Sequence, residues 1–368
     1  MSGSIFVMCP GQLSGVYDDD ALAVYAARTG FPVLRDRFGF LNAFSHWRFM
    51  DGSISFPLSG STANFAYLMD NRAVEILNLV RNEGKEIHIF LSGGVDSTAM
   101  TIAMLKVSDG DFRNLHVVFN ESTEEEYPEF VEYLKTTGID MVRCRPTDID
   151  DIQERLLETG YTLTGWAADQ LFGSIINQVW PDWYFKDWRD WLRLEEKTVS
   201  MGNAIGQFEE AFAHYGMPIK TFGEFAWFMN FSAKYNVVVN SDVFYSGKVT
   251  HRMISFYDTP EFNEWSVSNF DVLHQYPQDD VVHYKTPLKD YIFVFNHDTA
   301  YRNGKGKVGS WGRAKYHENV KVHPSVCLME SPDKAVFRRE DKILPIEKAL
   351  EVNKILARNI LRLYRKQV

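Results

Sequence analysis

The spacing of apolar residues changes near residue 70, and this change separates two parts of the chain. Before it lie three short apolar runs typical of β-strands, at residues 4–8, 38–41 and 53–56. Asp51-Gly52 is a residue pair typical of a tight hairpin turn. We therefore expect residues 1–68 to form a small β-rich cap.

After this cap, apolar residues recur with a helical period. Ala73, Ile76, Leu77 and Val80 would share one face of a helix, and Gly84 stands where a helix commonly ends. The pattern therefore predicts a helix with one apolar face that ends near Gly84.

Apolar runs and helical segments then alternate. The expected strands are 87–91, 115–119, 140–144 and 161–164, and the expected helices between them are 98–107, 124–136 and 149–159. This alternation is typical of a doubly wound parallel sheet, because parallel neighbours need a crossover connection. The predicted fold class is α/β.

Beyond Asp169 the strand pattern ends, and aromatic-rich helical segments follow at residues 183–194 and 222–235. A last amphipathic helix is predicted at 345–366, with basic residues near its end. We expect residues 69–330 to form one domain with a helical elaboration, and residues 331–368 to form a helical tail packed on it.

Composition narrows the classes of function. The chain has 368 residues, 45% of them hydrophobic, which is enough to fill a substantial core. Its 49 acidic and 39 basic residues give a net charge of -10, which argues against a surface built to coat nucleic acid. A nucleic-acid substrate is therefore only a secondary hypothesis.

The cysteines and the apolar runs bear on location. Cys9, Cys144 and Cys327 lie far apart without metal-ligand spacing, so neither a disulfide framework nor a zinc site is predicted. No run reaches the roughly 18 apolar residues of a membrane span, and no signal-peptide pattern begins the sequence. We expect a cytoplasmic protein that does not interact with membranes.

Residues 92–97, Ser-Gly-Gly-Val-Asp-Ser, follow the first predicted strand of the sheet and precede a helix. The two glycines allow the backbone to approach phosphate oxygens closely. Successive amides, the positive end of the helix and the hydroxyls of Ser92 and Ser97 would then face an anion. Asp96 is better suited to bind Mg²⁺ beside the phosphates than to contact a phosphate itself.

The residues of this turn allow two other interpretations. A glycine-rich strand-to-helix turn with no ligand is the usual interpretation of an isolated Gly-Gly pair. A Walker-type P-loop is disfavoured, because the chain lacks GxxxxGK[ST]. Residues 304–310 come nearest to that pattern, but the required lysine is missing.

Three segments resemble the PP-loop ATP pyrophosphatases, in particular the synthetase domain of asparagine synthetases, β-lactam synthetases and lasso-peptide cyclases. Residues 91–97 resemble that family's LSGGxDS, and residues 164–173 resemble its SGEGADELFGG. Residues 284–289 with 305–309 are more weakly similar to its KxxLR and RPKxG. The resemblance covers about residues 70–315 and implies a HUP-like nucleotide-binding fold.

The resemblance also implies roles for individual residues. Those expected to bind ATP or its pyrophosphate are Leu91, Ser92, Gly93, Gly94, Asp96, Ser97, Thr164 and Gly165, with the backbone at Val118 and Phe119 holding adenine. Asp96 and Asp169 would hold Mg²⁺. Lys307, with Lys305 as its rival, would stabilise charge on the α-phosphate.

The activity implied is that of an AMP- and pyrophosphate-forming amide ligase. A small-molecule carboxylate would be adenylated by ATP and then passed to ammonia or an amine. A homo-oligomer is left open.

Two departures from the family pattern affect the amine step. Trp166 replaces the family's Glu, and an indole cannot accept a proton. Glu195 and Glu196 are conceivable replacements, although two acids on an amphipathic helix are more often a solvated face. Ser2 follows Met1 where glutamine-dependent members have a Cys, so we expect no glutaminase, and a separate amidotransferase is left open.

Two alternative functions remain. One is a PP-loop enzyme that modifies a nucleobase or tRNA, although the scattered cysteines argue against sulfur transfer. The other is a nucleotide-binding module without catalytic activity, of which Trp166 would be the sign.

Overall fold

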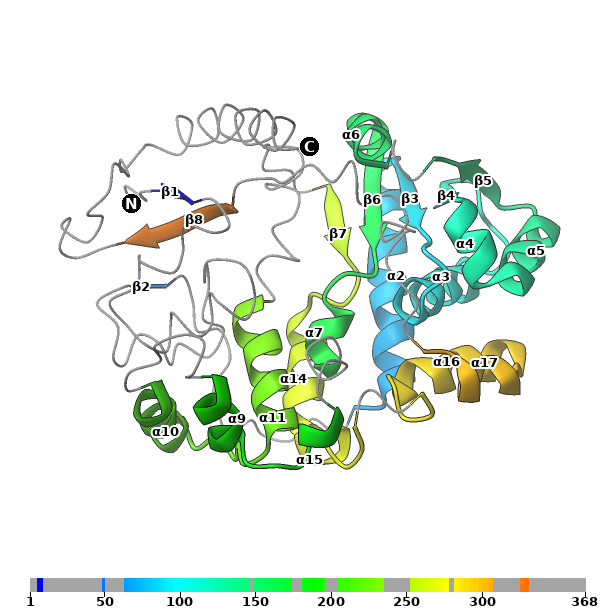
Figure 1. Cartoon of the computed structure of the whole chain (residues 1–368). Coiled ribbons are helices and arrows are strands. Elements are labelled where there is room, and N and C mark those ends of the chain that lie inside the picture. The colour runs from blue at the N-terminus through cyan, green and yellow to red at the C-terminus, as the bar shows by residue number, and fades with distance from the viewer. Residues whose placement is uncertain are drawn as a thin grey trace, which may run out of the picture. The chain divides into compact units, whose positions relative to one another are not determined.

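The computed structural model describes residues 5–8, 48–49, 63–145, 149–173, 181–195, 204–234, 252–277, 281–306 and 325–330 (Figure 1). The chain divides into two compact units, each formed by segments distant in sequence. The first, unit 1, comprises residues 1–59, 173–249 and 321–368, and the second, unit 2, comprises residues 60–172 and 250–320. The boundaries expected at residues 68 and 330 differ from this division and stay a prediction.

Unit 2 contains a five-stranded sheet in which every strand is parallel to its neighbours. Its strands are β3 (Glu86–Phe90), β4 (Leu115–Phe119), β5 (Asp140–Arg143), β6 (Gly160–Thr164) and β7 (Met253–Ser255). They lie side by side in the order β5-β4-β3-β6-β7 (Figure 1). The predicted α/β class with a doubly wound parallel sheet is confirmed.

The strand order reverses next to β3. From β3 the chain moves outward through β4 to β5, then returns to place β6 and β7 on the other side. In open α/β sheets, ligands bind beyond the carboxyl ends of the strands where the order reverses. The segment that follows β3 is therefore where this fold offers a site.

Helix α2 (Phe65–Glu83) begins and ends for identifiable reasons. The side chain of Asn64 accepts a hydrogen bond from the Ala66 amide at 2.8 Å, which caps the first turn. Gly84 takes a left-handed conformation, with φ 61°, that ends the helix as predicted. The helix begins earlier than the pattern indicated, because Phe65, Leu68 and Met69 also lie on its buried face.

Helix α3 (Val95–Ser108) corrects the expected start at Thr98. Gly94 is the extended residue before its first turn, so the helix begins inside the glycine turn. Most of its residues are buried, so this helix lies within the core of unit 2.

The single helix expected at 124–136 is two helices, α4 (Glu121–Glu126) and α5 (Pro128–Thr137). Pro128 has no amide hydrogen, and the residue before a proline is disfavoured in the helical region. Tyr127 accordingly has a non-helical backbone, with φ -148° and ψ 72°. Helix α6 (Ile149–Thr159) has the predicted ends.

The aromatic-rich segment of unit 1 forms helices α9 (Trp188–Glu195), α10 (Ala204–Tyr215) and α11 (Phe222–Met229), with a short turn of 3-10 helix, η4 (Pro181–Trp183). The helix expected at 183–194 therefore starts at Trp188. Trp188 stacks on Phe225 at 4.9 Å between ring centroids, and both are fully buried. The helix expected at 222–235 changes to a π-helix, η5 (Asn230–Lys234).

Unit 1 also contains a three-stranded antiparallel sheet in the order β1-β8-β2. Its strands are β1 (Ile5–Met8), β2 (Arg48–Phe49) and β8 (Ser325–Glu330). The strand predicted at residues 4–8 is confirmed as β1. The strands expected at 38–41 and 53–56, the Asp51-Gly52 turn and the helix expected at 345–366 lie outside the described residues.

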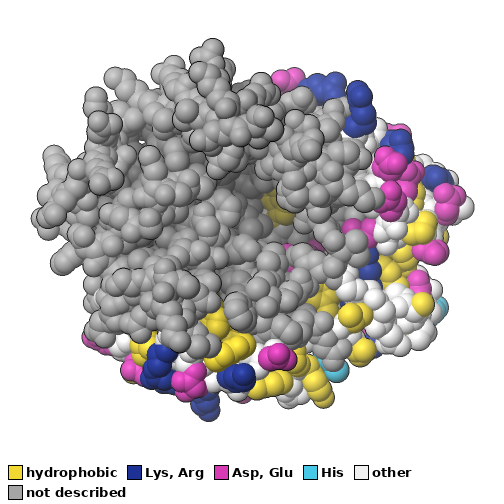
Figure 2. Space-filling view, viewed as in Figure 1, with side chains coloured by type: hydrophobic (Ala, Val, Ile, Leu, Met, Phe, Trp, Pro, Cys, Tyr) yellow, Lys and Arg dark blue, Asp and Glu magenta, His cyan; other side chains and the backbone are white. Residues whose placement is uncertain are grey.

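No helix in the described ranges is long and apolar enough to cross a membrane. In the view of Figure 2, acidic and basic side chains are interspersed along the described part of the surface.

Candidate functional site

The segment after β3 forms a compact turn that leads into α3. Gly93 has a φ of 81°, a left-handed conformation that residues with a side chain rarely adopt. A Cβ at Gly93 would lie 3.0 Å from Cβ of Glu126 and 3.1 Å from the carbonyl oxygen of Thr123. Both conformation and space therefore require glycine here.

Two serine hydroxyls fix the shape of this turn. The Oγ atoms of Ser92 and Ser97 lie 2.9 Å apart, and the Ser92 amide donates to Ser97 Oγ at 3.1 Å. Ser97 Oγ donates to the Gly94 carbonyl at 3.2 Å, and the Gly94 amide donates to Ser92 Oγ at 3.3 Å. The turn is held in shape by its own side chains.

The turn also presents the amino end of a 14-residue helix. The first amides of a helix have no partner within it, and the helix dipole favours a negative charge there. Leu91, directly after β3, is fully buried, and its amide donates to the Val118 carbonyl at 2.9 Å. A buried, hydrogen-bonded strand end therefore leads into an anion-favouring turn.

Lys285 joins the two acids predicted to hold Mg²⁺. Its Nζ lies 2.5 Å from Asp96 Oδ2 and 2.6 Å from Asp169 Oδ1. Asp96 lies in the first turn of α3, Asp169 in the first turn of α7 (Ala168–Phe172), and Lys285 directly before α16 (Thr286–Asn296). Three helix starts thus converge on one buried ammonium group.

Lys285 carries a positive charge despite its burial. Its side chain is 1% exposed, and burial alone would lower its pKa. The charges of Asp169 and Asp96 outweigh that effect and raise the pKa of Lys285 well above its ordinary value. The group is therefore a fixed cation between two carboxylates.

The backbone around these acids is strained. Ala167, one residue before α7, has a φ of 71°, and Lys285 has a φ of 49°. A positive φ costs free energy for a residue with a side chain, and such residues concentrate at functional sites. Two of the four positive-φ residues other than glycine in the described ranges lie within this cluster.

The end of β6 packs directly against the turn. Thr164 is buried, and a Cβ added at Gly165 would lie 3.0 Å from the amide nitrogen of Ser97 and 3.2 Å from the carbonyl carbon of Asp96. This close approach explains why glycine follows the strand. Thr164 and Gly165, at the end of β6, therefore lie directly against the turn and the start of α3.

The donor set of Asp96 and Asp169 fits a hard divalent cation. Mg²⁺ is commonly bound by one or two carboxylates together with substrate phosphates and water. The two side chains converge on one cation and remain 23% and 18% exposed, respectively, so both are open to a ligand. The part of the chain that is described has no group of three His, Cys, Asp or Glu arranged for a metal, so phosphate and water would have to complete the shell.

The two predicted lysines have different outcomes. Lys307 lies outside the described residues. Lys305, directly after α17 (Thr299–Gly304), is buried, and its Nζ lies 2.8 Å from Glu126 Oε1. Because Glu126 lies against Gly93, this ammonium group belongs to the surroundings of the glycine turn.

The backbone carbonyls of Val118 and Phe119, the residues predicted to hold adenine, accept hydrogen bonds from neighbouring segments of unit 2. The carbonyl of Val118 accepts from the Leu91 amide at 2.9 Å, and that of Phe119 accepts from the Cys144 amide at 2.8 Å. The next residue, Asn120, is fully buried, and its Nδ2 has no hydrogen-bond partner among the described residues. Asn120 is therefore an unpaired donor at this strand end that the sequence did not single out.

Trp166 lies in the turn between β6 and α7. It is half-buried, and its carbonyl accepts a hydrogen bond from Ser255 Oγ at 2.7 Å. Of the acids considered as substitutes for the family's Glu, Glu195 ends α9 in unit 1 and Glu196 lies outside the described residues. Glu126 and Lys285 are the two charged residues of the site whose roles the sequence did not indicate.

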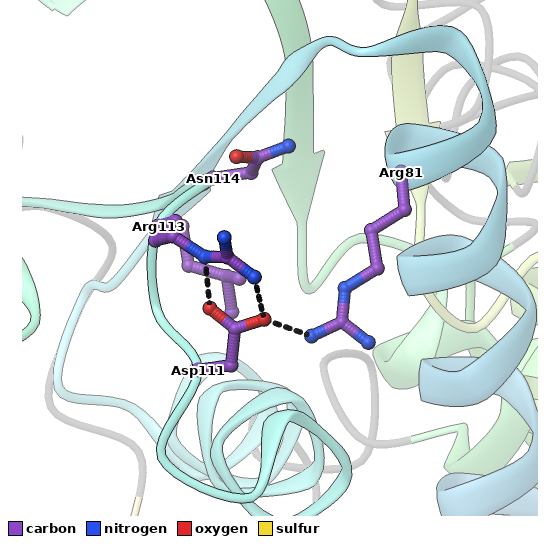
Figure 3. A pocket seen from close by; sticks show the side chains of 5 residues that line it. Arg81, Asp111, Arg113 and Asn114 are labelled. Carbon is purple, nitrogen blue, oxygen red and sulfur yellow. Dashed lines mark hydrogen bonds and ion pairs between the residues drawn. The ribbon is translucent and has the colours of Figure 1, made fainter.

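A separate pocket of about 240 Å³ lies at the amino end of β4, away from the strand ends that carry the glycine turn (Figure 3). Asp111 there accepts two hydrogen bonds from Arg113, at 2.8 and 2.9 Å, and one from Arg81 at 3.1 Å. The hydrogen bonds from Arg113 lower the pKa of Asp111 to about 2. These charges satisfy one another, so the glycine turn is the better candidate site.

No protein-family model matches the chain, and no curated protein matches it. Among solved structures it is similar to the U34-tRNA thiolase NcsA from Methanococcus maripaludis, a structure that includes a 4Fe-4S cluster. The two chains are 12% identical over 70% of this chain and 89% of NcsA, with a TM-score of 0.25. At this TM-score the likeness assigns neither an activity nor a cofactor to the chain.

Proposed function

We propose that the chain binds ATP at the glycine turn and cleaves it to AMP and pyrophosphate while activating a carboxylate. The observation that carries this proposal is the convergence of Asp96, Asp169 and Lys285 beside an anion-favouring helix start. The resemblance to the PP-loop motifs supports the same interpretation, because these three residues come from three separate motif segments and contact one another.

The phosphates of ATP would bind to the turn through electrostatic contacts. The amides at the start of α3 and the hydroxyls of Ser92 and Ser97 would face the pyrophosphate portion. Lys305 would add a positive charge beside Gly93 and Gly94. Lys307 is proposed on sequence alone to act at the α-phosphate.

Asp96 and Asp169 are the residues that would hold Mg²⁺ beside Lys285. Bound there, the ion would neutralise part of the phosphate charge. Lys285 would keep the two carboxylates close together, since their mutual repulsion would otherwise separate them.

The proposed reaction has two steps. A carboxylate oxygen of the substrate attacks the α-phosphorus, the bond from that phosphorus to the bridging oxygen breaks, and pyrophosphate leaves. Ammonia or an amine then attacks the acyl carbon of the adenylate, AMP leaves, and the nitrogen loses a proton. The product is an amide.

The amine step would differ from the family pattern at Trp166. An indole ring cannot accept the proton, so it would instead pack against the acyl group or the amine. Ammonia would come from solution or from a separate amidotransferase, and an amine substrate would need neither.

The proposal is tested with ATP labelled with ³²P at the α-phosphate, magnesium, ammonium and a panel of carboxylic acids that includes aspartate. We expect labelled AMP to appear only with the correct acid. Asp96→Asn and Asp169→Asn should each reduce the rate of AMP formation on the order of 10²–10³-fold, since each removes a carboxylate that would hold Mg²⁺ beside the phosphates. Asp290→Asn, at a partly exposed ion pair with Arg302, is the matched control.

The same assay separates the alternatives. Labelled AMP that forms only when tRNA replaces the acids would support base modification, and the name of NcsA suggests tRNA as the probe. Calorimetric ATP binding without AMP under any condition would support a non-catalytic nucleotide-binding module. Labelled ADP as the sole product would exclude the proposed chemistry.

A further inference from the structure

Glu126 places a buried carboxylate against the glycine turn. It is the last residue of α4, and its side chain is 7% exposed. A Cβ at Gly94 would lie 3.7 Å from its Oε1. A negative charge of the protein therefore lies against a turn that is shaped to favour an anion from solution.

The partner of this carboxylate is Lys305. Its Nζ lies 2.8 Å from Glu126 Oε1 and also donates to the Glu126 carbonyl at 3.3 Å. The Tyr301 ring lies on another side of the ammonium, with its centroid 5.8 Å from Nζ. At 8% exposure, Lys305 has little access to water, so it depends on Glu126, its anionic partner among the described residues.

The elements that carry this pair are anchored. Thr123 Oγ1 on α4 donates to the Leu91 carbonyl at 2.8 Å, which joins α4 to the end of β3. On the other side, Tyr301 of α17 stacks on Tyr127 at 4.2 Å between ring centroids. Packing of α4 and α17 therefore holds the two charged side chains of this ion pair in place.

We infer that Glu126 is an internal counter-ion that competes with the phosphates of the nucleotide for Lys305. This inference rests on the proposed binding of ATP at the turn. In the free protein, Glu126 neutralises Lys305 and so avoids an unpaired buried ammonium group. When phosphate binds, two anions share one ammonium and repel each other, so Glu126 lowers the affinity of the site for phosphate.

Glu126→Gln separates competition from support, because the amide keeps the shape of the side chain and its hydrogen-bonding oxygen. If Glu126 competes, the variant should bind inorganic pyrophosphate about tenfold more tightly than the wild type, since one nearby negative charge is removed. Its thermal midpoint without ligand should fall, because Lys305 then lacks a counter-ion. If Glu126 only supports Lys305, the variant should bind pyrophosphate more weakly.

The experiment is calorimetric titration of the full chain with inorganic pyrophosphate in the presence of magnesium chloride. The matched control is Glu124→Gln, which makes the same chemical change on the same helix at an exposed ion pair with Arg143. Its affinity should stay within about twofold of the wild type. Unchanged or weaker binding by Glu126→Gln would overturn the inference.

A second comparison covers the case in which Glu126→Gln does not fold. Lys305→Met should weaken pyrophosphate binding about tenfold or more, because it removes a cation beside the turn while the negative charge of Glu126 stays there. Adding Glu126→Gln to that variant should restore most of the loss, and no restoration would overturn the inference. Wild-type protein that does not bind pyrophosphate or ATP would refute the proposed function itself.

Discussion

The ammonium group of Lys285 lies 2.5 Å from both carboxylate oxygens of Asp96, although the two residues are 189 positions apart in sequence. The lysine side chain is 1% exposed and the aspartate side chain is 23% exposed. The pair therefore joins a buried cation to an acid that still faces solvent. Because Asp169 contacts the same Nζ, removing the cation would leave two carboxylates together.

Lys285→Met should destabilise the protein by about 3–5 kcal/mol, because it breaks a buried ion pair by removing one partner. The remaining Asp96 and Asp169 would repel each other, so magnesium should stabilise the variant more than it stabilises the wild type. Chemical denaturation with and without magnesium chloride measures both effects.

Lys106→Met is the matched control for this prediction. Lys106 pairs with Asp70 at 2.7 Å, but both side chains are more than a third exposed. An exposed pair of this kind contributes about 0–1 kcal/mol. A loss for Lys285→Met as small as that of Lys106→Met would contradict the role given to the buried cation.

The local parts of the fold could be predicted from sequence because their signals are local. The strand at Leu115–Phe119 and the helix at Ile149–Thr159 have the predicted ends, since a run of apolar residues and a helical period each identify one element. The glycine turn could be predicted in the same way, because strand, glycines and helix follow one another directly.

Other features depend on residues that are distant in sequence. Strand β7 is only three residues long, Met253–Ser255, and gains its strand conformation by pairing with β6 at the edge of the sheet. Three residues carry too little periodicity to be recognised as a strand.

The ion pairs between charged groups of the site were beyond prediction for the same reason. Glu126 and Lys305 are 179 positions apart, and Glu126 lies among several acids in sequence. Only packing of α17 against the α4–α5 junction shows which of these acids is buried. Lys285 lies in the segment 284–289, which is only weakly similar to the family's KxxLR motif. Its contact with both aspartates is visible only in the folded chain.

Gly165→Ala should impair the glycine turn. The added methyl group would lie 3.0 Å from the Ser97 amide nitrogen and 3.2 Å from the Asp96 carbonyl carbon, so the start of α3 must move. We expect pyrophosphate to bind at least about tenfold more weakly, because misaligned amides lose their contacts with the anion. Calorimetric titration with magnesium pyrophosphate measures the loss.

Gly304→Ala is the control for that substitution. A Cβ at Gly304, near the end of α17, would meet no atom within 4 Å. Its pyrophosphate affinity should match that of the wild type. Equal affinities for both glycine variants would show that the contact of β6 with the turn does not matter for binding.

The last prediction concerns His88, which is buried beside a second histidine. Its ring is 5.0 Å from that of His116 between centroids, and neither ring nitrogen has a hydrogen-bond partner within the described part of the chain. Burial and the charge of His116 lower the pKa of His88 to about 4, against opposing effects of Glu86 and Asp140. The folded chain therefore keeps this ring neutral at pH values where the unfolded chain protonates it.

The sign of the pH dependence follows from this difference. His88 takes up a proton near pH 6.5 in the unfolded chain and near pH 4 in the folded chain. The contribution of a neutral His88 to the free energy of unfolding is therefore complete above pH 6.5 and is lost as the pH falls toward 4. Between pH 7 and pH 5 the loss is about 2 kcal/mol. Urea unfolding at both values should show a drop smaller by about that amount for His88→Gln than for the wild type. His297→Gln, at an exposed ring, should retain the wild-type drop, whereas an unchanged drop in His88→Gln would show that the buried ring is not the source.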